Sequence, residues 1–130
     1  MFIVLWLALA VRMVSRVRFV SAEDNRGAAY AAPSAQLAVK AAFLQNTLEQ
    51  SVIAIGAHLT LATLIDGSAL ALIVGAVVLF VIGRAAFLFG YPNGAGARAF
   101  GMVVTALPSI CAAIWALWLI GAGFAKDVFS

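Results

Sequence analysis

The sequence predicts an all-α fold: an integral membrane four-helix bundle formed by one domain over residues 1–130. The 130 residues are 65% hydrophobic and 10% charged, with a mean hydropathy of +1.11. Soluble domains are about half apolar and about a quarter charged. The apolar residues also gather into four long segments that lack the polar outward face of a soluble bundle. Lipid is therefore expected to cover these segments.

The first expected helix covers about residues 1–19. Its uninterrupted apolar run ends at Val11, which is short of the about 20 residues that a crossing requires. Arg12, Arg16 and Arg18 then occupy the last turns, from which long side chains can reach the lipid head groups. The alternative is a start upstream of Met1. Because the cations follow the apolar run instead of preceding it, we expect a retained helix and not a signal peptide.

The second expected helix covers about residues 35–64, after a polar loop over residues 20–34. Ser34 is the predicted N-cap. Glu49 stands in the middle of this apolar helix, where a carboxylate is costly and normally faces a bundle interior or a water-filled cavity. Asn46 and Gln50 lie on the same helical face. This polar stripe is the first candidate site.

The third and fourth expected helices cover about residues 69–89 and 99–124. The turn Asp66-Gly67-Ser68 precedes the third, and a polar loop over residues 90–97 separates the two. Pro108 lies inside the fourth helix and is expected to bend it. The single cysteine, Cys111, lies in the same apolar helix and is expected to be a small buried hydrophobe.

The distribution of charge predicts the orientation in the membrane. Cations cluster beside the first and third loops, so both loops are expected in the cytoplasm and both termini on the opposite side, in a bacterial inner membrane. The net charge of +3 comes without a basic stripe interleaved with aromatics, so no nucleic-acid partner is expected. Small residues such as Gly75 and Gly83 allow helices to approach closely, and the expected partners are lipid and further copies of the chain.

Several cations gather at the same membrane face as the polar stripe. They are Arg16, Arg84 and Arg98, with Tyr91 near the end of the third helix. Taken singly, each arginine can be an interfacial anchor. Together with a carboxylate they could bind a small zwitterionic or anionic ligand. His58 has no second His or Cys at ligand spacing, so we expect a packing residue and no metal site.

Four segments together resemble the MAPEG superfamily, the membrane-associated proteins of eicosanoid and glutathione metabolism. The segments are residues 46–50 (NTLEQ), 83–87 (GRAAF), 90–92 (GYP) and 98–101 (RAFG). Their order, spacing and helical layout match over nearly the whole chain. The resemblance implies a homotrimer that binds glutathione between subunits near the cytoplasmic face. It also implies a transferase or peroxidase acting on small lipophilic electrophiles.

The resemblance assigns roles to individual residues. Arg98 matches the arginine that stabilises the thiolate, and is the expected catalytic residue. The residues expected to bind glutathione are Asn46, Glu49, Arg84, Tyr91 and, by a looser alignment, Arg16.

The chain departs from the family pattern at two positions. Ala42 stands where glutathione-binding members have an arginine, and Phe87 stands where a tyrosine is frequent. Two expected contacts to glutathione are therefore missing. Whether the chain is an enzyme stays open, because two other classes fit the residues. One is a small proton- or cation-coupled carrier that uses Glu49, and the other is a non-catalytic bundle.

Overall fold

The computed structural model describes residues 1–26 and 32–129, which form four α-helices and no strand. These are α1 (Phe2–Val20), α2 (Ala35–Ala62), α3 (Leu70–Gly90) and α4 (Ala95–Phe129). The all-α prediction is confirmed. The first three helices begin and end within two residues of the expected positions. The fourth begins four residues early, because the turn after α3 closes at Gly94, whose φ of 90° favours glycine.

The helices belong to two compact units, residues 1–51 and 52–130, so that α2 contributes to both. In the first unit, residues of α1 and of the start of α2 line a common cavity. The prediction of one domain over residues 1–130 is not tested by this division and stays a prediction.

The start of α2 is fixed by a hydrogen-bonded cap. The hydroxyl of Ser34 accepts from the backbone N–H of Leu37 at 3.2 Å, which confirms Ser34 as the N-cap. The carboxylate of Asp24 in turn accepts from the Ser34 backbone N–H at 2.9 Å and from its hydroxyl at 2.7 Å. These bonds lower the pKa of Asp24. The loop is thereby tied to the helix that follows it.

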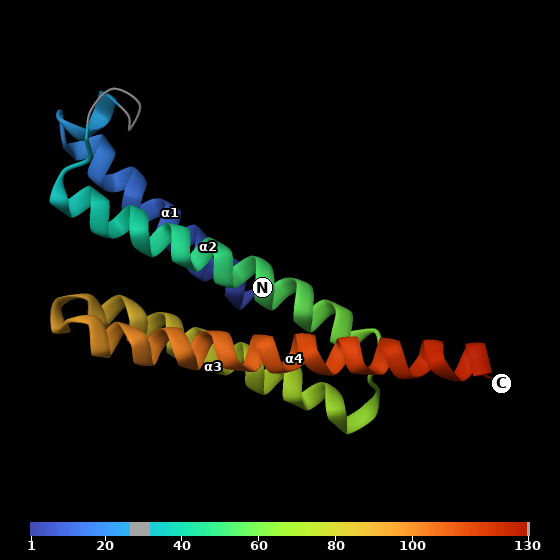
Figure 1. The fold of residues 1–130 in the computed structure, drawn as a ribbon. Helices are drawn as coiled ribbons and strands as arrows, with labels where there is room; N and C mark the ends of the chain where they lie inside the picture. Colours follow the sequence, from blue (N-terminus) through green and yellow to red (C-terminus); the bar gives the residue numbers. More distant parts are fainter. Residues whose placement is uncertain (27–31, 130) are drawn as a thin grey trace. The chain divides into compact units, whose positions relative to one another are not determined.

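In the second unit, α3 and α4 are antiparallel neighbours held in close contact by glycines (Figure 1). A Cβ added at Gly101 would lie 2.3 Å from the backbone nitrogen of Phe87, and one at Gly83 would lie 2.7 Å from that of Thr105. Gly90 makes a similar approach to Ala97. At Gly75, near the other end of α3, an added Cβ would meet nothing within 4 Å. The close backbone approach marked by these three glycines thus lies toward the loop that joins the two helices.

Two segments among the described residues are long and apolar enough to cross a membrane: Gly67–Phe89 and Ala95–Val128. Both lie in the second unit, and α4 continues as a helix through Pro108. Crossing by α1 and α2 stays a prediction.

Candidate functional site

Arg84 is fully buried in the α3–α4 unit, at 0% exposure. Its Nε donates to the hydroxyl of Thr105 at 3.1 Å, and that hydroxyl donates to the Gly101 carbonyl at 2.8 Å. The guanidinium also lies over the ring of Phe87, at 4.7 Å from the ring centroid, and over that of Phe80 at 6.0 Å. These contacts give Arg84 a packing role, and its predicted contact with a ligand stays a prediction.

The same cluster extends to Arg98 through two aromatic rings. Phe87 and Tyr91 meet edge to face, with centroids 5.4 Å apart. The guanidinium of Arg98, in the first turn of α4, lies 5.0 Å from the centroid of Tyr91. Cations are attracted to the faces of aromatic rings. The structure thus brings together three predicted residues, Arg84, Tyr91 and Arg98, in what we call the arginine–aromatic cluster.

An open cavity of about 280 Å³ adjoins this cluster. Its walls are apolar except for the half-buried Arg98. Phe87 therefore joins the site as an aromatic wall. The residues that line the cavity are Phe87, Ala95, Arg98, Ala99 and Met102.

The other predicted site residues belong to the first unit. The carboxylate of Glu49 accepts from the side-chain amide of Gln45 at 2.8 Å and lies on the exposed surface of the chain. The expectation that Glu49 faces a bundle interior or a water-filled cavity stays a prediction. Gln50, on the same helical face, is half-buried. Asn46 is half-buried on the same helix.

Arg16 lines a cavity of about 520 Å³ together with Lys40 and Gln36. Neither Asn46 nor Glu49 lines this cavity. Two cations thus share one space at the loop end of α1 and α2, where an anionic group would be favoured. The sequence interpretation did not foresee the contribution of Lys40.

Three further features were missed from the sequence. Thr105 follows Arg98 by seven residues, two helical turns, and that spacing could have placed both on one face of α4. Gln45 precedes Glu49 by four residues, which is the ordinary spacing for a side-chain hydrogen bond on a helix. Cys111 was expected to be buried, and the structure shows it exposed.

Comparison with known proteins gives one family. Neither the curated proteins nor the solved structures give a match. The model of the MAPEG family matches residues 1–118. This match covers most of the 130 residues and includes all the residues of the arginine–aromatic cluster. Together with the two long apolar helices, it identifies the chain as a membrane protein that belongs to the MAPEG family.

Proposed function

We propose that this protein is a membrane glutathione transferase that conjugates small lipophilic electrophiles. The observation that carries the proposal is the cavity beside Arg98, in which one guanidinium stands among apolar walls. Such a site serves both reactants, because the cation attracts a thiolate while the apolar walls accept an electrophile that partitions from lipid.

The chemistry assigned to Arg98 is stabilisation of the glutathione thiolate. A free thiol has a pKa of about 8.5, so only a few per cent is ionised near neutral pH, and an adjacent fixed cation raises that fraction. The thiolate attacks the electrophilic carbon, a C–S bond forms, and the leaving group departs with the bonding electron pair. Stacking on Tyr91 limits the positions open to the guanidinium, so its charge is held beside the sulfur.

Peroxidase activity at the same site is the related alternative. There the thiolate attacks a hydroperoxide oxygen, the O–O bond breaks, and the other oxygen leaves as an alkoxide that is protonated to the alcohol. A second glutathione then attacks the resulting sulfenic acid to form the disulfide and water. Both reactions need the same stabilised thiolate and the same apolar approach for the substrate.

The tripeptide would be held by Asn46, Glu49, Tyr91 and Arg16, with Arg84 fixing the aromatic rings beside it. Exposure of Glu49 supports this role, since an outward carboxylate on an apolar helix needs a ligand or a neighbouring subunit to cover it. We propose that a homotrimer supplies that neighbour.

The proposed membrane is a bacterial inner membrane. The loop between α1 and α2 and the loop between α3 and α4, beside which most cations lie, then face the cytoplasm. In this orientation Arg98 lies near the cytoplasmic surface, where glutathione is available. Both termini then face the opposite side.

The test is a titration of the purified protein with glutathione, following the ultraviolet absorbance of the thiolate near neutral pH. We expect saturable thiolate formation at millimolar glutathione, lost in Arg98→Gln and retained in Lys126→Gln, which removes a cation at the other end of α4. We expect Ala42→Arg to tighten binding. Absence of glutathione binding both in the wild type and in Ala42→Arg would contradict the proposed transferase function.

The same material tests the carrier that uses Glu49. A carrier predicts proton release on addition of a transported cation, and loss of that release in Glu49→Gln. The transferase predicts that Glu49→Gln weakens glutathione binding without any such proton movement.

A further inference from the structure

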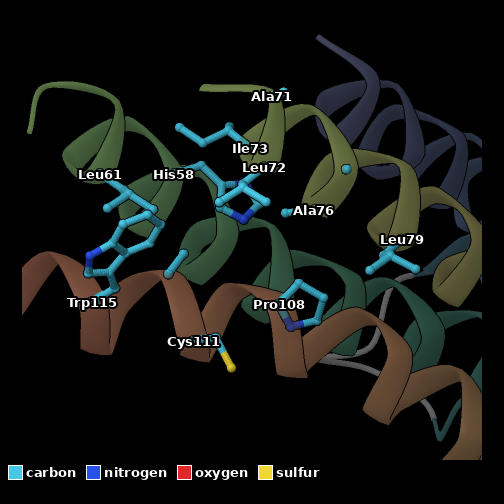
Figure 2. Close-up of a pocket in the computed structure, with 12 residues that line it drawn as sticks. His58, Leu61, Ala71, Leu72, Ile73, Ala76, Leu79, Pro108, Cys111 and Trp115 are labelled. Carbon is cyan, nitrogen blue, oxygen red and sulfur yellow. The ribbon is translucent and has the colours of Figure 1, made fainter. Parts of the chain in front are cut away.

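A second cavity, of about 380 Å³, lies in the other half of the second unit (Figure 2). The end of α2, the first half of α3 and the middle of α4 line this open cavity, and its walls are mostly apolar. It shares no lining residue with the cavity beside Arg98. Apolar cavities of about 150 Å³ bind benzene. This one therefore has room for a substituted or two-ring aromatic molecule.

His58 supplies the one strongly polar side chain in this cavity. The side chain is 4% exposed, and neither ring nitrogen has a hydrogen-bond partner among the described residues. Figure 2 shows the imidazole among the residues that line the cavity. A neutral imidazole carries one donor and one acceptor nitrogen. Buried polar groups without partners are uncommon in native proteins, so this one calls for an explanation.

We propose that this cavity binds a small lipophilic molecule with one neutral hydroxyl group, such as a phenol, which hydrogen-bonds to His58. A hydroxyl both donates and accepts, so it can pair with either ring nitrogen. A pure hydrocarbon leaves the imidazole unpaired. An anion would be buried without a cation, because no Lys or Arg lines the cavity. The described residues also contain no group of three potential metal ligands.

The ligand enters from the lipid. Leu72, Leu79 and Cys111 at the edge of the cavity are exposed, and they lie on the two segments that are apolar enough to cross a membrane. The opening therefore faces hydrocarbon, and a lipophilic phenol reaches it by partitioning into the bilayer. Leu61 and Trp115 then provide apolar contacts for the body of the ligand.

The test uses fluorescence quenching in lipid nanodiscs by two brominated probes that differ only in the hydroxyl group, 4-bromophenol and bromobenzene. The reporter protein carries Trp6→Phe and Trp118→Phe, so Trp115 in the cavity is its remaining tryptophan. A matched control carries Trp6→Phe and Trp115→Phe and retains Trp118, which is exposed three residues further along α4. Quenching is compared at equal probe concentration in the lipid.

We expect 4-bromophenol to quench Trp115 saturably, at about tenfold lower concentration than bromobenzene, the change expected for one hydrogen bond. His58→Leu should abolish the difference between the probes, and Ala76→Leu should prevent saturable quenching by filling the cavity. Trp118 should be quenched alike by both probes. Equal quenching of Trp115 by both probes, or a hydroxyl preference that survives in His58→Leu, overturns the proposal. The comparison of the two probes in the reporter protein decides the outcome even where a variant does not fold.

Discussion

The two ends of the second unit differ in the partners that they give to a buried polar side chain. At the loop end, Arg84 is fully buried and engages Thr105 and two aromatic rings. Toward the other end, His58 is almost as deeply buried, and its two nitrogens have no partner among the described residues. Lipid supplies no hydrogen bonds, so each polar side chain depends on what the protein or a ligand provides. Arg84 thus has a hydrogen-bond partner and two aromatic neighbours within the chain, whereas the imidazole of His58 has no hydrogen-bond partner among the described residues.

The largest expected effect comes from separating the helices at the loop end. We expect Gly101→Ala to destabilise the protein by about 3 kcal/mol or more, because the new Cβ would meet backbone atoms of Phe87 that cannot move aside. Gly75→Ala is the matched control and should be neutral or slightly stabilising, since it enters open space. Thermal unfolding in detergent measures both. Equal stability of the two variants would refute the tight contact at Gly101.

A smaller loss is expected when the partner of Arg84 is removed. Thr105→Val keeps the shape of the side chain but deletes the hydroxyl, and should cost about 2 kcal/mol, as for a hydrogen bond to a charged group. Ser109→Ala serves as the control, because its hydroxyl lies 3.5 Å from the Thr105 carbonyl, at the limit of a hydrogen bond. A larger loss in Ser109→Ala than in Thr105→Val would contradict the assigned role of Thr105.

At His58 we expect a substitution that stabilises the fold. In ligand-free protein, His58→Leu should stabilise the fold by about 1 kcal/mol, because it replaces an unsatisfied polar group by an apolar side chain of similar size. The measurement is the same thermal unfolding, with Leu61→Ala as a control that removes buried apolar atoms and should destabilise. Destabilisation by His58→Leu would mean that the imidazole is paired within the protein, and the contrast between the two ends would fail.

The smallest effect is expected at Asp24, in the loop that precedes α2. Hydrogen bonds from Ser34 lower the pKa of Asp24 in the folded protein, so Asp24 stabilises the fold above its unfolded pKa of about 3.9. That contribution is lost as the pH falls through the lower folded value. Asp24→Asn should therefore unfold more readily than the wild type near neutral pH, and the difference should shrink in acid. A difference that is constant with pH would exclude the carboxylate as its cause.

The sequence predicted the features that depend on local pattern. Helical periodicity and apolar content located the helices, and Ser34 was recognised as a cap from its position alone. Arg84, Tyr91 and Arg98 were selected by type and spacing, and the structure brings them together. The contacts of each residue could not be predicted in the same way, because they depend on neighbours distant in sequence. Thr105 as the partner of Arg84, the exposure of Cys111 and the unpaired state of His58 are all of this kind.

The glycine contacts between α3 and α4 also bear on how such a protein can diversify. Gly83, Gly90 and Gly101 confine substitutions at one end of the helix pair, since any side chain there would displace backbone. Gly75, toward the opposite end, carries no such restriction, because its surroundings are open. Descendants of this chain could therefore exchange the residues around His58 and acquire preferences for new compounds while the arginine end stayed unaltered. Close helix contact at one end of the pair would then coexist with sequence variation at the other.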